Sequence, residues 1–258
     1  MVTQELLNHK HINFYGCSFT DGGGLDNPIY LKNILDKDWF PNKWKQEWDG
    51  INCFYKFKDY YRFSNIIQRQ LNCEISNFSR TANNNEHIFN KVFENINNKD
   101  TIHIVQWSYT ERQLYWNDKL KSFFRIQGIK EYANVFDLED NFNEDNPNYE
   151  KMIEHYMEFL TKYYNVEYES KKLNSLTELL TSYSKLNNIQ LYFLPWERQL
   201  KSLTNFILES TLEWSIKNKM RISDETNKGY DDGHLSFKGN HEVANTILER
   251  FKKDNLLK

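Results

Sequence analysis

Short apolar runs alternate with longer amphipathic segments along most of this chain. Four runs have the length and the β-branched and aromatic content of buried strands, and they cover residues 12–15, 73–78, 101–107 and 190–194. Apolar residues at helical spacing fill much of the sequence between them. Strands separated by helices predict right-handed βαβ units, and therefore an α/β fold with a central parallel sheet and helices on both faces.

The helical stripes predict where these helices lie. A first helix is expected over residues 59–71, and a terminal helix is expected after Ser236, whose hydroxyl suits an N-cap. Leu203, Phe206 and Ile207 indicate one more helix before it. The other stripes are Ile88, Phe89, Val92, Phe93 and Ile96; Ile153, Tyr156, Met157, Leu160 and Tyr164; Leu173, Leu176, Leu180 and Tyr183; and, in the terminal helix, Val243, Ala244, Ile247, Leu248 and Phe251.

Two segments do not follow this alternation. Residues 22–58 carry tryptophans among lysines and aspartates without a clean period, and residues 113–149 are polar, aromatic and rich in turn-forming residues. We therefore predict one domain over residues 1–258, with insertions at about 22–58 and 113–149. Aromatic side chains of the first insertion could stack on sugar rings or line an acyl pocket, but we expect them mainly to pack the insertion onto the body of the domain.

Composition argues against several classes of protein. The 36 acidic and 33 basic residues give a formal charge of −3, so no electrostatic footprint for nucleic acid is present. The apolar runs are too short to cross a bilayer and the N-terminal residues lack a signal-peptide core, so we expect a cytoplasmic protein that binds no membrane. Cys17, Cys53 and Cys73 are not spaced for a disulfide framework, and the histidines do not cluster, so we expect no metal and no cofactor.

The chemistry-bearing residues stand near the two ends of the chain. Ser18 follows the first predicted strand after a Gly-Cys pair, at the edge where open α/β sheets place their ligands. A serine hydroxyl needs a base within hydrogen-bond reach and a third group that orients the base. Histidine is the side chain best suited to general-base chemistry near neutral pH, so His234 is the candidate base, and Asp231 or Asp232 could hold its other ring nitrogen. Cys17 is the neighbouring alternative nucleophile, although successive side chains diverge and only one of the two can face the histidine.

Three short blocks in this order resemble the SGNH, or GDSL-type, hydrolase family. They are Gly16-Cys-Ser-Phe-Thr20, Asn77-Phe-Ser-Arg-Thr-Ala-Asn-Asn84 and Asp231-Asp-Gly-His-Leu-Ser-Phe-Lys-Gly-Asn240, and they cover only a small part of the chain. The resemblance implies a three-layer α/β/α sandwich with a flavodoxin-like sheet. It also implies Ser18 as the nucleophile, His234 as the base and Asp231 as the residue that orients it.

The resemblance further implies an oxyanion hole, which this chain builds from altered residues. Its donors would be the backbone N–H of Ser18 and that of Ala82, which stands where the family has a glycine. The family's third block, with an asparagine, is replaced here by Gln106-Trp-Ser108-Tyr, so the Ser108 hydroxyl is the closest substitute. Arg112 follows shortly after and could bind an anionic substrate group or pair with a carboxylate. Pairing is the commoner role of an arginine, and it is the one we expect.

Together these residues predict a serine esterase that forms an acyl intermediate on Ser18, with acetyl or short acyl groups on a carbohydrate as the first substrates to try. Two alternatives remain open. One is an acyltransferase, in which a second alcohol replaces water. The other is a non-catalytic binding or structural protein that keeps the SGNH scaffold, which the altered third block and the aromatic insertions would suit.

Overall fold

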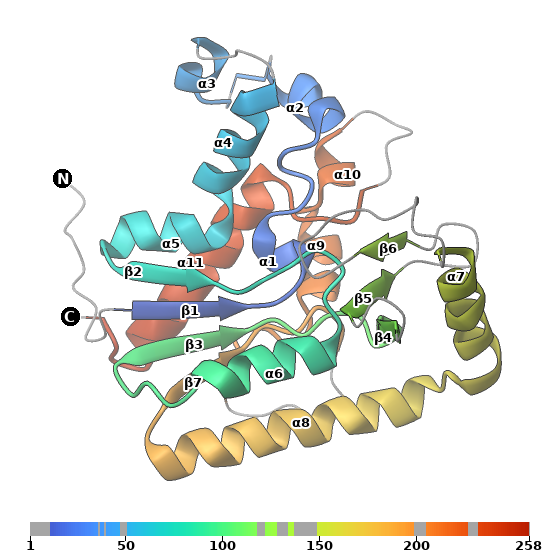
Figure 1. Cartoon of the computed structure of the whole chain (residues 1–258). Coiled ribbons are helices and arrows are strands. Elements are labelled where there is room, and N and C mark those ends of the chain that lie inside the picture. The colour runs from blue at the N-terminus through green and yellow to red at the C-terminus, as the bar shows by residue number, and fades with distance from the viewer. Residues whose placement is uncertain are drawn as a thin grey trace.

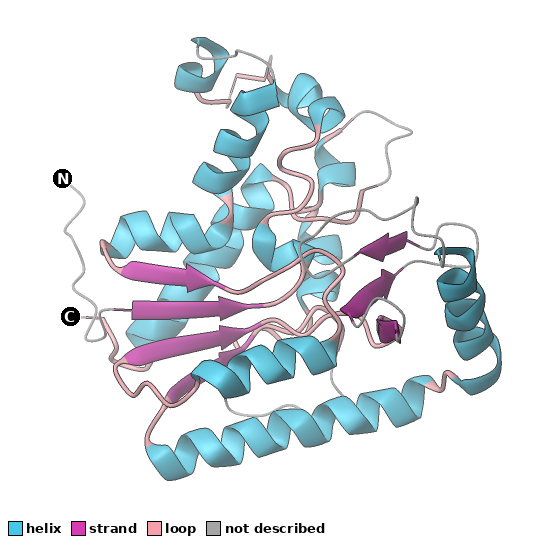
Figure 2. Ribbon diagram, viewed as in Figure 1, coloured by secondary structure: helices cyan, strands magenta, loops and turns pink. Residues whose placement is uncertain are grey.

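The computed structural model describes residues 11–35, 37–38, 40–46, 51–117, 122–127, 134–136, 149–198, 205–226 and 232–257. It confirms the predicted fold class, because a central parallel sheet lies between helical layers (Figure 1 and Figure 2). The four strands are β1 (His11–Tyr15), β2 (Glu74–Asn77), β3 (Thr101–Val105) and β7 (Gln190–Phe193). Their order across the sheet is β2-β1-β3-β7, and every neighbouring pair is parallel.

Side-chain alternation along the strands separates two hydrophobic cores. In β1, Ile12 and Phe14 point to one face and Tyr15 to the other. The first face packs on α5 (Phe63–Leu71) and α11 (Phe237–Lys253), and the second packs on α6 (Asn85–Asn95) and α8 (Val166–Asn187). Because both faces are covered, the middle strands β1 and β3 are almost wholly buried.

A short polar ladder runs through this buried sheet. The Asn13 amide donates to the Tyr15 hydroxyl at 3.0 Å, and that hydroxyl lies 3.0 Å from His103 Nδ1. His103 Nε2 is 3.4 Å from the carbonyl oxygen of Asn98. Burial lowers the pKa of His103 to about 4, so the ring is neutral at physiological pH and its Nε2–H donates to the carbonyl.

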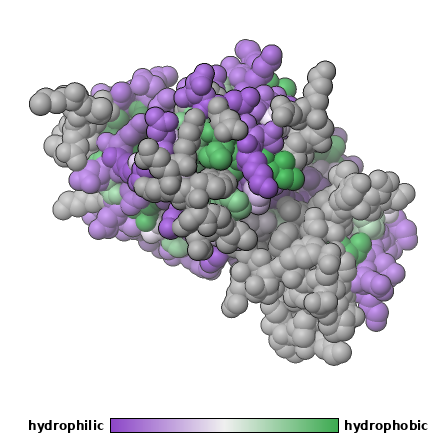
Figure 3. Space-filling model, turned by 90° about the horizontal axis from the view of Figure 1, so that it is seen from above, coloured by the Kyte–Doolittle hydropathy of each residue, from purple (hydrophilic) through white to green (hydrophobic). Residues whose placement is uncertain are grey.

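The first predicted insertion contains a helical cap. It consists of α2 (Pro28–Ile34), α3 (Asn42–Gln46) and much of α4 (Ile51–Tyr61), which form a hydrophobic cluster of their own with Trp44 and Phe57 inside it. Trp44 is buried, as the packing interpretation of these aromatics requires, whereas Trp39 and Trp48 lie outside the described residues. Figure 3 looks down on the molecule from above and shows hydrophobic surface between hydrophilic side chains. Ile29 and Tyr55 of the cap are exposed.

The second predicted insertion contains a small antiparallel sheet. Its strands are β4 (Gln113–Asn117), β5 (Ser122–Gln127) and β6 (Asn134–Phe136), in that order. Helix α7 (Tyr149–Glu158) packs against it through Met152 and Tyr156, and the π-helical turn η1 (Phe159–Tyr163) continues α7 toward α8. Among the described helices, none is both long enough and apolar enough to span a membrane.

Two predicted helices differ from the structure. The helix expected over residues 59–71 is two helices, because Arg62 takes an extended conformation between α4 and α5. The helix expected around Phe206 is wrong in the described part: Phe206 forms a parallel bridge with Phe193, and the Ile207 N–H donates to the Phe193 carbonyl at 2.9 Å. The edge of β7 that no other described strand covers pairs with this segment through backbone hydrogen bonds, so the segment is extended there. A helix, α9 (Thr211–Asn218), begins only after the Ser210 N-cap.

Candidate active site

The chain turns sharply between β1 and Ser18. A Cβ atom at Gly16 would lie 2.8 Å from the Thr20 Cβ and 3.2 Å from the Gln106 Cβ, so only glycine fits without movement of its neighbours. The Thr20 hydroxyl donates to Gln106 Oε1 at 2.5 Å, which joins this turn to the end of β3. Ser18 then begins the short helix α1 (Ser18–Asp21) at the carboxyl edge of the sheet, as the sequence predicts.

The structure brings Ser18 and His234 together, although 216 positions separate them in the sequence. The Ser18 Oγ lies 2.9 Å from His234 Nε2, and His234 Nδ1 lies 2.7 Å from Asp232 Oδ1. With Nδ1 protonated toward the carboxylate, Nε2 is free to accept the serine proton. Ser18 is largely buried, and the His234 side chain is 28% exposed, so the base is reachable from solvent.

The carboxylate in this chain is Asp232. Asp231, which the family resemblance implied, lies outside the described residues. Asp232 Oδ1 accepts a hydrogen bond from the backbone N–H of His234, at 2.8 Å, and a second one from ring Nδ1 of the same residue. This is the turn that aspartate forms with the backbone two residues on, and it fixes the imidazole orientation locally.

The segment that carries His234 is held by its neighbours on both sides. The N–H of Ile222, at the start of α10 (Ile222–Glu225), donates to the His234 carbonyl at 2.8 Å, and the Ser223 N–H donates to that of Asp232 at 3.1 Å. On the other side lies Gly23, where an added Cβ would be 2.9 Å from His234 Nε2 and 3.0 Å from the Ser18 Cβ. The glycine loop after Ser18 therefore packs directly on the serine and histidine, a role different from the phosphate cradle that glycine-rich loops form.

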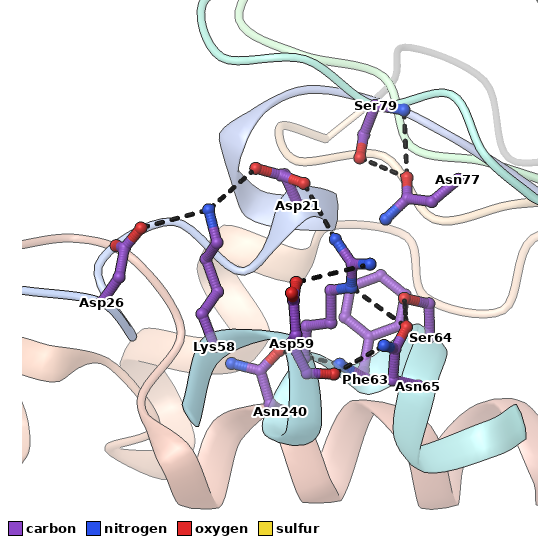
Figure 4. A network of polar contacts seen from close by, with 11 residues as sticks. Asp21, Asp26, Lys58, Asp59, Phe63, Ser64, Asn65, Asn77, Ser79 and Asn240 are labelled. Carbon is purple, nitrogen blue, oxygen red and sulfur yellow. Dashed lines mark hydrogen bonds and ion pairs between the residues drawn. The ribbon is translucent and has the colours of Figure 1, made fainter. Parts of the chain in front are cut away.

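Ion pairs fasten α1 and the glycine loop to the helices beneath them (Figure 4). Lys58 of α4 lies 3.4 Å from Asp21 and 3.1 Å from Asp26, and Arg62 Nη1 donates to Asp21 Oδ1 at 3.1 Å. Burial disfavours the Lys58 charge, yet the two carboxylates together raise its pKa above the ordinary value. This charge network positions both ends of the segment that follows the serine.

The loop that contains Ala82 docks on the glycine turn. The Asn83 side-chain amide donates to the Gly16 carbonyl at 2.8 Å, and the Arg80 N–H donates to the same oxygen at 3.3 Å. Ala82 is buried and has a φ of 58°, in the left-handed region that favours glycine. That conformation fits the resemblance, in which this position is a glycine.

Ser108 is anchored through its backbone. Asn85 Oδ1 accepts the Ser108 N–H at 2.8 Å, and its side-chain amide lies 3.3 Å from the Ser108 carbonyl oxygen. The Ser108 hydroxyl is buried and has no hydrogen-bond partner among the described residues. The backbone N–H of Ser108 already donates to Asn85, so the hydroxyl is the group of Ser108 that could donate a hydrogen bond to an oxyanion.

Aromatic rings form one side of the site. The Phe19 ring stacks on Trp196 with centroids 3.4 Å apart and lies 4.7 Å from the His234 ring. The Arg112 guanidinium carbon lies 5.9 Å from the Phe19 centroid and 5.3 Å from that of Tyr109. No ion pair joins Arg112 to another described residue, although its charge acts on the carboxyl groups of Glu111 and Glu197, so the expected pairing with a carboxylate stays a prediction.

Two partly buried carboxyl groups, those of Glu111 and Glu197, lie near Arg112. Burial raises the pKa of Glu111 to about 7, with Glu197 adding to the rise and Arg112 opposing it. Burial also raises the pKa of Glu197, whose Oε2 accepts the Thr110 N–H at 3.3 Å. A raised carboxyl pKa near a serine and a histidine is common in functional sites, and burial is the dominant cause here.

Sequence reasoning missed several of these residues. Asn85 was visible only as one of three consecutive asparagines, and Gly23 only as part of a flexible loop. No local signal marked Phe19 or Trp196 as neighbours of His234, because their contacts join distant segments.

Comparisons with protein-family models, curated proteins and solved structures gave no match for this chain.

Proposed function

We propose that this protein is a serine hydrolase of the SGNH type that cleaves an ester through an acyl intermediate on Ser18. The observation that carries the proposal is the continuous hydrogen-bonded series from the Ser18 hydroxyl through His234 to Asp232. Nucleophile, base and orienting carboxylate in that arrangement are the parts that serine acyl chemistry requires. Their position at the carboxyl edge of a parallel sheet supports the same conclusion.

The reaction begins when Ser18 Oγ attacks the ester carbonyl while His234 Nε2 takes the hydroxyl proton. The negative charge of the tetrahedral intermediate falls on the former carbonyl oxygen. His234 then returns the proton to the departing alcohol, and Ser18 remains acylated. Water activated by the same imidazole releases the acid and restores the serine. Asp232 keeps the imidazole oriented and stabilises its charged form throughout.

Stabilisation of the oxyanion is assigned to the Ser18 N–H, the Ala82 N–H and the Ser108 hydroxyl. Ala82 is held on the Gly16 turn by its neighbours, and the buried Ser108 hydroxyl has no hydrogen-bond partner among the described residues. A hydroxyl rotates more freely than a carboxamide, so this donor is weaker than the asparagine of the family. We therefore propose a slow esterase that prefers activated esters.

Labelling with a fluorophosphonate probe tests the proposal. The wild type should be labelled covalently, Ser18→Ala should not, and both should have the same circular dichroism and melting temperature to within about a degree. Ser175→Ala is the control, because Ser175 is on α8 and its hydroxyl bonds only to the Lys171 carbonyl of its own helix. Absence of labelling in the folded wild type would instead favour a non-catalytic scaffold.

A further inference from the structure

Arg112 is a buried arginine, and no ion pair joins it to another described residue. It is only 7% exposed, and its Nε and Nη1 atoms have no hydrogen-bond partner among the described residues. Its contacts are instead with the Tyr109 and Phe19 rings. Burying a charged group whose hydrogen-bond donors are unpaired costs stability, and an anionic ligand bound beside Arg112 would reduce that cost.

The guanidinium stands beside the candidate active site. Phe19 directly follows the nucleophile, and its ring contacts both the His234 imidazole and the Arg112 guanidinium. Phe19 therefore lies next to both the proposed base and Arg112, so an ester bound at Ser18 would have the guanidinium nearby. The unpaired N–H groups of a guanidinium are donors that suit carboxylate oxygens.

Arg112 also lines a small cavity, of about 30 Å³, between the start of α6 and the side of α8. Asn84 and Asn85 at the N-terminus of the eleven-residue α6 line it as well, and the N-terminal end of a helix favours negative charge. The size admits the charged end of a ligand and not a whole substrate. Asn85, through its bonds to Ser108, ties this cavity to the loop that follows β3.

Several carboxyl groups lie around the cavity or interact electrostatically with Arg112. Glu86 forms an ion pair with Lys172, and Glu169 lies at the same lining. Arg112 lowers the pKa values of Glu111 and Glu197, although burial, the largest effect on each, raises both. Neither forms an ion pair with Arg112 in the described structure.

We propose that Arg112 is a specificity-determining residue that binds a carboxylate of the substrate, so that the preferred ester carries an anionic group near its scissile bond. This inference rests on the proposed hydrolase function. The carboxylate belongs either to the acyl part, as in a half-ester of a dicarboxylic acid, or to the alcohol part, as in an acidic sugar. Both present the same group to the guanidinium.

Two matched pairs of esters separate these sources. On the acyl side, kcat/KM is measured for mono-p-nitrophenyl glutarate and for p-nitrophenyl hexanoate; on the alcohol side, for p-acetoxybenzoate and p-acetoxybenzamide. The wild type should prefer the anionic member of one pair by roughly ten- to a hundredfold. Arg112→Met should remove that preference, Arg112→Lys should keep part of it, and Arg198→Met should keep all of it, because Arg198 is exposed and paired with Glu213. Equal loss for both members of a pair, or an unchanged ratio in Arg112→Met, overturns the proposal.

A binding measurement keeps this inference separate from the hydrolase proposal. In the Ser18→Ala protein, glutarate or p-hydroxybenzoate at millimolar concentration should raise the melting temperature, and the rise should vanish when Arg112→Met is added. Without ligand, Arg112→Met should melt no lower than its parent, because no bond to the protein is lost. If the acids raise the melting temperature but the wild-type protein hydrolyses none of the four esters, the result would support the anion site and reject the hydrolase. No rise with either acid would overturn the anion site.

Discussion

Asp232 Oδ1 accepts two hydrogen bonds from His234, one from its backbone N–H at 2.8 Å and one from its ring Nδ1 at 2.7 Å. A single carboxylate oxygen thus fixes both the loop conformation and the tautomer of the proposed base. Since Asp232 is only two residues before His234, the orientation is set locally. The rest of the chain needs only to bring Ser18 to the free Nε2.

Adjacent aspartates offer a direct test of this arrangement. Asp232→Asn should lower kcat by about 10³- to 10⁴-fold, because an amide favours the wrong imidazole tautomer. Asp231→Asn should change kcat by less than about fivefold if Asp232 alone orients the ring. Both variants are compared on one activated ester. The opposite order of effects would assign the role to Asp231, as the family spacing implies.

Gly23 is expected to be required for activity and Gly233 is not. A Cβ at Gly23 would lie 2.9 Å from His234 Nε2 and 3.0 Å from the Ser18 Cβ, whereas one at Gly233 meets nothing within 4 Å. Gly23→Ala should therefore displace the imidazole from the serine and lower kcat/KM by about ten- to a hundredfold. Gly233→Ala, next to His234 in sequence, should stay within about twofold of the wild type. Similar values for the two variants would mean that the glycine loop does not bear on the reacting pair.

Local patterns were enough to predict the sheet and the terminal helix, whereas the pairing of Ser18 with His234 was predicted from the family resemblance together with the strand before Ser18. The apolar pattern of β1 and the helical spacing of apolar residues after Ser236 are clear sequence signals, because both elements bury defined faces. No sequence pattern distinguishes Asp231 from Asp232, because two neighbouring aspartates in a turn differ only in the backbone geometry that the fold gives them. Family spacing favoured the first, and the structure places the second on the ring.

Long-range contacts account for the other differences. The extended path of Phe206 is set by the open edge of β7, which no helical stripe reveals. Arg112 was expected to pair with a carboxylate because most arginines do. It lies beside two aromatic rings, and its charge acts on the carboxyl groups of Glu111 and Glu197 without an ion pair among the described residues. Neither outcome follows from the residues next to it in sequence.

Ala82 and Ala244 should respond in opposite ways to glycine. Ala82 has a φ of 58°, a conformation that costs an alanine about 1 kcal/mol relative to glycine, so Ala82→Gly should leave the free energy of unfolding unchanged or raise it by up to about 1 kcal/mol. Ala244 lies buried within α11, where Ala244→Gly should lower it by about 1 kcal/mol or more. Urea unfolding of the three proteins measures both effects. A clear loss of stability in Ala82→Gly would show that its methyl group is needed for packing.

Ser108 offers a test of the weakened oxyanion hole. Its hydroxyl has no described partner, so Ser108→Ala should not lower the melting temperature, but kcat/KM should fall by about tenfold or more if the hydroxyl stabilises the intermediate. Ser108→Asn restores a carboxamide and should raise turnover on a simple acetyl ester. Equal kcat/KM values for wild type, Ser108→Ala and Ser108→Asn would remove position 108 from the oxyanion hole.

Glu111 should make the protein less stable as the pH rises toward neutrality. Burial raises its pKa from 4.5 to about 7 in the folded state, so between these values the folded protein binds a proton that the unfolded chain has released. The stabilising contribution is complete below about pH 4.5 and is lost as the pH rises through about 7, a change of about 2 to 3 kcal/mol. His103 acts in the opposite direction, because its lowered pKa removes stability as the pH falls from 6.5 to about 4.

Replacing Glu111 with glutamine separates its contribution from that of His103. Glutamine stays neutral at every pH, while His103 titrates in both proteins and cancels in the difference between them. The free energy of unfolding of the wild type minus that of Glu111→Gln should therefore fall as the pH increases from 4.5 to 7.5. Urea titrations at half-unit pH intervals measure this difference, with Glu94→Gln on the exposed face of α6 as the control that should keep the wild-type profile. A difference that stays flat across the range would mean that Glu111 is ionised alike in the folded and unfolded states, and that burial does not keep its carboxyl group neutral beside Arg112.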